Sequence, residues 1–171
     1  TGERRLATCR DTLEVIRLLD ALDNLQVISG GTMPQDVPPE VAHLYMNSIT
    51  LKNTSKHVSL GINDPDSVND DIKMASAVVG DEEKLRRRPI ISFGTTCSSP
   101  LMFEKEHTRG LLEAVKRGFP VNVETGCMAS ATAPVTLSGT MVLSNAEFLS
   151  ALTMVEIAKP GAPFTVMSLA R

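Results

Sequence analysis

The sequence predicts an α/β protein that forms part of a (β/α)8 TIM barrel, with about five βα units of a longer chain. Apolar segments typical of strands begin near residues 25, 57, 90, 120 and 163, and a segment with helical periodicity separates each from the next. This alternation predicts βαβ units with a parallel sheet. No Gly-x-Gly-x-x-Gly turn follows the first strand, and the loops after the third and fourth strands are long and polar. Both observations favour a barrel over a doubly wound dinucleotide-binding sheet.

The individual elements follow from local patterns. The first helix has apolar residues at helical spacing after a capping Thr8 or Asp11, and the second is expected to start after Pro39. Gly118 ends the fourth helix, and a charged linker is expected over 80–88. In order, helices are expected over 8–22, 40–52, 68–79, 104–117 and 138–158, and strands over 25–29, 57–62, 89–94, 119–124 and 162–167.

The composition is that of an ordinary globular protein. Of the 171 residues, 42% are hydrophobic and 22% charged, with a formal charge of −3, which argues against a disordered or coiled-coil chain. The only basic run lies at 84–88, so no nucleic-acid partner is expected. No stretch is expected to reach the roughly 18 apolar residues of a membrane span. Three scattered cysteines do not suggest a disulfide framework, which favours a reducing, cytoplasmic setting.

Both ends of the chain are expected to be cut. The chain opens on charged residues without an initiator Met and stops within or just after an apolar run. A complete barrel needs about 250 residues. We therefore expect residues 1–171 to be the N-terminal part of a single barrel domain.

The most informative stretch is a run of small residues over 126–140, between the fourth strand and the last helix. Small side chains let a ligand approach the backbone closely, and free amides at a helix start can bind an anion. A tight structural loop that lets the helix pack on the sheet has the same composition. Composition alone leaves the two interpretations open.

Several motifs resemble those of the trimethylamine methyltransferase family, which includes the glycine betaine:corrinoid methyltransferases. The most specific are ATAPVTLSGT at 131–140, NAE at 145–147 and KPGAP at 159–163. Weaker similarities occur, in order, at 7–8, 18–24, 33–38 and 51–56. The resemblance therefore covers nearly the whole chain. Family members are much longer TIM barrels, in agreement with the expected truncation.

The resemblance implies an enzyme of the EC 2.1.1 type in one-carbon metabolism such as methanogenesis. It would transfer a methyl group from a methylated amine to the Co(I) of a corrinoid carried by a partner protein, so no cofactor would be bound directly. Glycine betaine or a similar quaternary amine is expected ahead of trimethylamine. The trimethylamine enzymes carry pyrrolysine in a part of the family beyond Arg171. Whether the protein forms a homo-oligomer is left open.

Substrate contacts are expected at the carboxyl ends of the strands, whereas the catalytic residues stay unassigned. Glu124, at the end of the fourth strand, can neutralise an ammonium group, although an ion pair with a neighbouring Lys or Arg is the alternative. Phe93 can hold a methylated ammonium through its ring face, with core packing as the alternative. The loop after the fourth strand adds four more substrate-binding candidates: Met128, Thr132, Pro134 and Thr136.

Other chemistry-bearing residues are interpreted as structural. Glu147 is expected to be a solvated or structural carboxylate in the last helix. Cys97 and Cys127 lack zinc-ligand spacing, and His43, His57 and His107 are expected on helices or a strand start, away from the loops. No metal site is therefore expected.

Two other functions compete with methyl transfer. A barrel lyase or aldolase would need a Lys at a strand end for a Schiff base, but Lys56 and Lys159 precede strands. A non-catalytic betaine-binding module is the second alternative. Binding without methyl transfer to added cob(I)alamin would distinguish that module from an enzyme.

Overall fold

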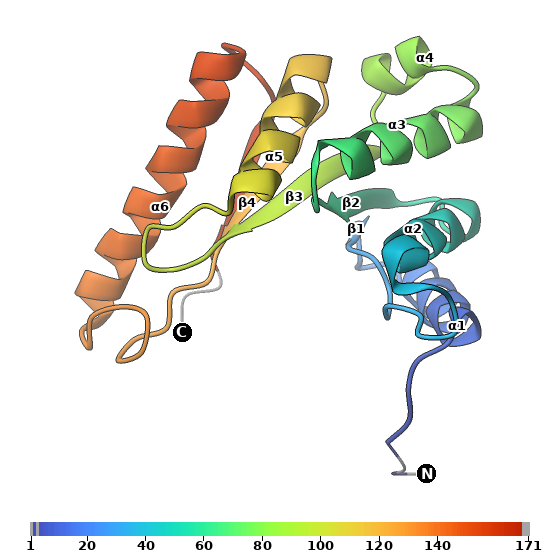
Figure 1. Ribbon diagram of the computed structural model, residues 1–171, viewed down its shortest axis with the longest axis horizontal. Coiled ribbons are helices and arrows are strands. Elements are labelled where there is room, and N and C mark those ends of the chain that lie inside the picture. Colours follow the sequence, from blue (N-terminus) through green and yellow to red (C-terminus); the bar gives the residue numbers. More distant parts are fainter. Residues whose placement is uncertain (1, 3, 169–171) are drawn as a thin grey trace. The chain divides into compact units, whose positions relative to one another are not determined.

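The computed structural model describes residues 2 and 4–168 (Figure 1). The helices are α1 (Cys9–Asp20), the 3-10 turn η1 (Pro39–Val41), α2 (Ala42–Asn53), α3 (Pro65–Val79), α4 (Glu82–Arg87), α5 (Lys105–Arg117) and α6 (Leu137–Ala158). The strands are β1 (Val27–Ile28), β2 (His57–Gly61), β3 (Ile91–Cys97), β4 (Val121–Thr125) and β5 (Phe164–Ser168).

The five strands form one sheet in the order β1-β2-β3-β4-β5. The pairs β1–β2, β3–β4 and β4–β5 are parallel. A doubly wound sheet reverses its strand order at a switch point, whereas a barrel adds strands in chain order. The predicted fold class, a partial (β/α) barrel, is confirmed.

The predicted elements are present with three differences. The segment 80–88, expected as a linker, contains the short helix α4. The Asp81 side chain accepts a hydrogen bond from Lys84 N, and ion pairs join Arg86 to Glu82 and Arg87 to Glu83 across one turn. β1 is only two residues long. β3 runs on to Cys97, so the expectation that Phe93 ends this strand is wrong.

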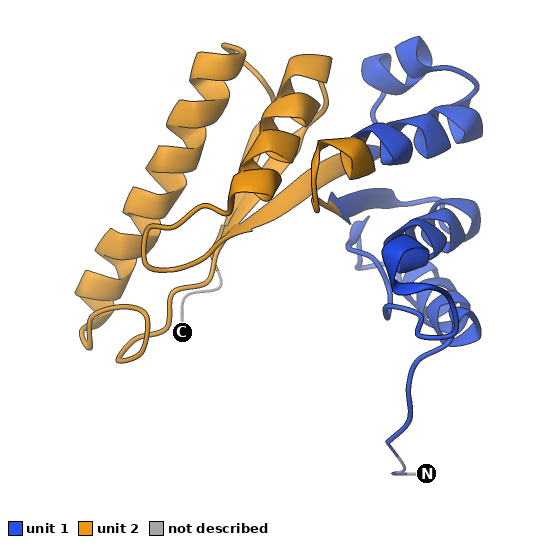
Figure 2. Ribbon diagram, in the orientation of Figure 1, with its two compact units in different colours: residues 1–60, 69–91 blue, residues 61–68, 92–171 orange. Residues whose placement is uncertain are grey.

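The chain divides into two compact units (Figure 2). Unit 1 comprises residues 1–60 and 69–91, and unit 2 comprises residues 61–68 and 92–171. In unit 1, α1 and α2 pack together, and a capping box between Thr8 and Asp11 starts α1. The Lys56 ammonium donates to the carbonyls of Leu19 and Leu22 at the end of α1, at 2.8 and 2.5 Å. Lys56, which directly precedes β2, therefore caps the carboxyl end of α1.

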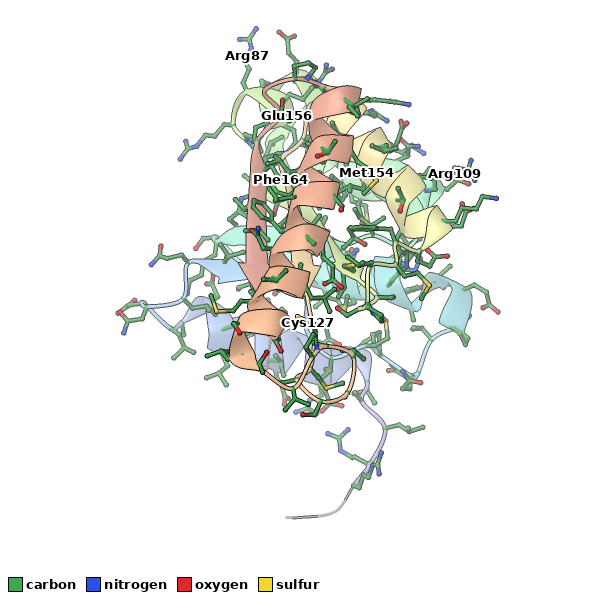
Figure 3. All side chains as sticks on the ribbon, turned by 90° about the vertical axis from the view of Figure 1, so that its left-hand side faces the viewer. Arg87, Arg109, Cys127, Met154, Glu156 and Phe164 are labelled. Carbon is green, nitrogen blue, oxygen red and sulfur yellow. The ribbon has the colours of Figure 1, made fainter. Side chains whose placement is uncertain are left out.

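In unit 2, α5 and α6 cover one face of the β3–β4–β5 sheet. The Phe93 ring meets Phe119 edge to face at 6.0 Å between centroids, and Phe148 of α6 stacks on Phe164 of β5 at 5.8 Å. Figure 3 shows Phe164 beside α6. A hydroxyl chain also ties α6 to the strand ends, from Thr125 to Ser144 at 2.6 Å and on to Ser168 at 3.1 Å.

Within the described residues, α6 is the one helix long and apolar enough to pass a length-and-composition test for crossing a membrane. The expectation that no stretch reaches this length is therefore wrong. The same helix fully buries the carboxylate of Glu147 and places Ser144 against Thr125. These polar contacts, together with the stacking of Phe148 on β5, make α6 a packing helix of the α/β layer in unit 2.

Candidate functional site

One face of the unit 2 sheet carries the polar residues at its strand ends. In the parallel register, Thr96 of β3 pairs with Glu124 of β4, and Glu124 pairs with Met167 of β5. Alternate residues of a strand point to opposite faces. The neighbouring residues Thr95, Val123 and Thr125 are buried, whereas Thr96, Glu124 and Met167 are half-buried or exposed. In a barrel the face not covered by helices is the interior, so Glu124 lies on the interior face at the carboxyl ends of the strands, where barrel enzymes in general carry their active sites.

A glycine makes room on this face for a polar side chain. Gly94 pairs with Asn122, two residues before Glu124. A Cβ atom at Gly94 would lie only 2.7 Å from the Asn122 amide nitrogen. The absence of a side chain at Gly94 therefore lets Asn122 lie across β3, beside the row that holds Thr96 and Glu124.

The predicted substrate loop after β4 is a self-contained turn. The Met128 carbonyl accepts hydrogen bonds from the amides of residues 131, 132 and 133, and the Met128 amide donates to the Thr132 hydroxyl. Thr136 caps α6 by accepting from Gly139 N, and the Pro134 carbonyl accepts from the Thr140 hydroxyl. These contacts are those of the structural-loop alternative. Of the four residues predicted here, Met128, Pro134 and Thr136 are exposed and Thr132 is half-buried.

Phe93 lies apart from the other predicted substrate residues. It pairs with Val121 and therefore faces the same side of the sheet as Val121 and Val123, opposite to Glu124. Its side chain is fully buried beside Phe119. The structure thus places Phe93 in the core, the alternative considered for it from the sequence.

Glu147 is a structural carboxylate that shapes the loop after β3. It is fully buried, and its two oxygens accept hydrogen bonds from the Ser99 hydroxyl and from Leu101 N, both at 2.9 Å. Leu101 has a φ of 56°, in the left-handed region that a leucine rarely adopts. The carboxylate on α6 therefore holds a strained loop in place between β3 and α5.

The two cysteines near the strand ends are buried free thiols. Cys97 donates to the Met102 carbonyl at 3.4 Å, and Cys127 donates to the Thr140 carbonyl at 3.6 Å. Burial, followed by the charge of Glu147, raises the pKa of Cys97 to about 11. Across residues 2 and 4–168, no group of three or more His, Cys, Asp or Glu side chains is arranged to hold a metal ion.

Sequence reasoning missed a cavity in unit 2 that contains a carboxylate and an imidazole. His107, expected away from the loops, lies in the first turn of α5 and lines a cavity of about 260 Å³ with Glu104. The cavity also includes Gly61 at the end of β2 and Thr96 near the end of β3. The sequence did contain a signal, the Glu-x-x-His spacing at 104–107 after a strand and its loop. When Glu104 caps the helix, its carboxylate accepts a hydrogen bond from the backbone N of His107, which brings the two residues together.

The sheet and its covering helices, with polar groups gathered at the strand ends, define part of an α/β-barrel protein with its candidate site at the carboxyl ends of the strands. The family model for trimethylamine methyltransferase (MTTB) matches residues 1–170, and the chain belongs to this family.

Curated relatives carry related names. The chain is 36% identical over 163 residues to a trimethylamine methyltransferase MttB of Desulfitobacterium hafniense, a match covering 95% of this chain and 33% of the relative. It is 29% identical to a glycine betaine methyltransferase of the same species, covering 95% and 34%. It is 30% identical to a trimethylamine methyltransferase MttB of Methanosarcina barkeri, covering 90% and 31%. The chain thus spans about a third of the length of these relatives.

Proposed function

We propose that the protein containing this chain is a methyltransferase that moves a methyl group from a methylated amine to the Co(I) of a corrinoid on a partner protein. The observation that carries the proposal is the family match over residues 1–170, supported by relatives named for trimethylamine and glycine betaine. A quaternary amine such as glycine betaine is proposed ahead of trimethylamine. The proposed setting is cytoplasmic one-carbon metabolism, including methanogenesis, in line with the Methanosarcina relative.

Glu124 is the residue of this chain best placed to meet the substrate. Its carboxylate lies on the uncovered sheet face, between Thr96 and Met167 in the register. A methylated ammonium has a positive charge but an apolar surface, so a nearby carboxylate and a soft Met side chain suit it. Binding there would orient one methyl group towards the barrel mouth, and orientation is the main contribution a protein can make to such a transfer.

The proposal places the corrinoid on the partner protein, as the family resemblance implies. The uncovered strand-end face of this chain offers a carboxylate and a hydroxyl suited to the amine. When docked, the corrinoid would supply the nucleophile that accepts the methyl group. The residues of this chain bind and position the amine.

A methyl-transfer assay with the full-length protein tests the proposal. Cob(I)alamin, or a Co(I) corrinoid protein, is mixed with glycine betaine or trimethylamine. We expect the Co(I) absorbance to fall and the demethylated amine to appear by NMR. Amine binding without either change would favour the betaine-binding module. A lysine adduct trapped by borohydride with a carbonyl substrate would favour the lyase alternative.

A further inference from the structure

The cavity at the ends of β2 and β3 contains a carboxylate and an imidazole that the face around Glu124 does not share. It measures about 260 Å³ and is built entirely from unit 2. Its accessible polar groups are the hydroxyls of Thr96 and Ser98, the Glu104 carboxylate and the His107 imidazole, and Thr95 also lines it but is buried. No lysine or arginine is among the described residues that line it.

Two glycines, Gly61 and Gly110, shape this cavity. A Cβ atom at Gly61 would meet nothing within 4 Å, so this position opens directly onto free volume. A Cβ atom at Gly110 of α5 would lie 2.4 Å from Ile62 Cγ2 and 3.1 Å from the Asp64 carbonyl group. Only a glycine at 110 lets α5 approach the segment after β2 this closely, which places the first turn of α5 against the cavity.

The cavity carries a fixed negative charge. Glu104 caps α5 by accepting from His107 N at 2.8 Å, and the same oxygen lies 3.7 Å from His107 Nδ1. The hydrogen bond from His107 N lowers the pKa of Glu104, which is therefore ionised at neutral pH. A carboxylate beside two hydroxyls accepts hydrogen bonds, so a cation with N–H donors is the complementary ligand.

The cavity adjoins the proposed substrate face. Thr96 lines the cavity and pairs in register with Glu124, so one residue borders both regions. Removing a methyl group from an ammonium leaves an amine that takes a proton in water. The product therefore carries one N–H more than its substrate, whether the substrate is a quaternary ammonium or trimethylammonium.

We propose that the cavity beside Glu104 and His107 binds the demethylated amine product, recognised through its N–H groups. This inference rests on the proposed methyl-transfer function. Glu104 and the hydroxyls of Thr96 and Ser98 accept the N–H bonds, and His107 fixes the carboxylate. Glu124 meets a methyl-covered cation instead, so the two neighbouring sites separate substrate from product by hydrogen-bonding capacity.

The test uses the full-length protein and two probes of equal charge. Dimethylammonium carries two N–H donors, whereas tetramethylammonium carries none. Binding is followed by calorimetry and by the ring signals of His107 in NMR spectra. We expect dimethylammonium to bind more tightly than tetramethylammonium and to shift the His107 signals. Equal binding of the two probes, or a silent His107 ring, would overturn the proposal.

Two substitutions test whether the preference for dimethylammonium arises at Glu104. Glu104→Gln keeps an oxygen that can cap α5 but removes the charge, and it should weaken dimethylammonium binding by about fivefold, the value of one half-exposed charged contact. Glu106→Gln is the matched control, because Glu106 pairs with Arg109, which projects outward from α5 (Figure 3). It should leave binding unchanged. The same loss in both variants, or in neither, contradicts the proposal.

A third variant does not depend on the helix cap. Gly61→Ala introduces a methyl group into open space, so it should fold normally and weaken dimethylammonium binding by reducing the free volume. Unchanged affinity in a folded Gly61→Ala protein counts against the site.

The methyl-transfer assay tests the proposed function independently of these binding measurements. Intact transfer without an N–H preference removes only this inference, and a retained preference without transfer removes only the proposed function.

Discussion

Among the described residues, each unit of the chain buries one carboxylate completely, and the two are compensated in different ways. Glu147 in unit 2 accepts two hydrogen bonds, one on each oxygen, from the loop after β3. Asp71 in unit 1 accepts one, from the Asn47 amide at 2.8 Å. Among the described residues, its other oxygen Oδ2 and the Asn47 carbonyl oxygen have no hydrogen-bond partner.

Glu147 therefore stabilises the loop that it contacts, whereas the incompletely hydrogen-bonded Asp71 lowers the stability of unit 1 when it is ionised. Glu147 fixes a loop that leads to the strand-end cavity, so its burial is offset by hydrogen bonds. For Asp71, burial dominates and raises the pKa to about 7, with the charge of Asp70 acting in the same direction and the Asn47 hydrogen bond opposing it. Across α2 and α3, Asn47 is the polar group that meets Asp71, and it does not titrate. The two units should therefore respond differently to substitution and to pH.

The largest effect is expected from Glu147→Ala. The substitution leaves Ser99 and Leu101 without their acceptor and opens a cavity in the core. We expect a loss of more than about 4 kcal/mol in the free energy of unfolding, measured by urea denaturation of the full-length protein. Glu147→Gln retains one acceptor oxygen and should lose less. Equal stability of the alanine variant and wild type would show that Glu147 is not a structural anchor.

Asp71→Asn should change stability in the opposite direction. Between the unfolded pKa of 3.8 and the folded value of about 7, the folded state holds the extra proton. Wild-type stability should therefore fall as pH rises through this window, by up to about 4 kcal/mol, and level off above it. The neutral asparagine variant should lack this decline and gain on wild type from pH 4 to 7. Asp70→Asn, at a partly exposed site, is the control and should retain most of the decline. A wild-type curve parallel to that of Asp71→Asn would contradict the assignment.

Glu124→Gln tests a carboxylate that is half-buried on the uncovered face. If Glu124 attracts the substrate cation, the variant should lower kcat/KM for methyl transfer by about tenfold, with little change in melting temperature. Glu106→Gln removes a carboxylate from the outer side of α5 and provides the comparison, with kcat/KM expected to stay unchanged. Normal turnover together with a reduced melting temperature would make Glu124 a structural ion-pair partner instead.

The smallest effect concerns the exposed end of α1. Hydrogen bonds from the Arg5 guanidinium and from Thr8 hold the pKa of Asp11 well below its usual range. A lowered pKa gives a contribution that is present above the unfolded pKa and is lost as pH falls, opposite in sign to Asp71. Arg5→Ala should raise the Asp11 pKa, as measured by NMR titration, and high salt should do the same in wild type. No change in either case would show that the ion pair does not form in solution.

Local patterns predicted most of the fold. Apolar spacing and breakers identified the five strands, the helix before them and the four helices that separate them, because each depends on neighbours within a few residues. The short helix α4 was missed because its charged residues were taken for a linker, although Asp81 and the spacing of Glu82 and Arg86 supply a cap and an ion pair. The motifs at 131–163 indicated the family, and the family match confirms it.

The functional side chains depended on contacts between distant segments. The sequence alone placed Glu124 at a strand end and determined the alternation of strands and helices. Only the tertiary structure put Phe93 in the core and His107 at a cavity, because the length of β3 and the approach of α5 at Gly110 determine which groups meet. The burial of Asp71 and Glu147 was likewise decided by packing, since a carboxylate has the same local pattern whether water or protein surrounds it.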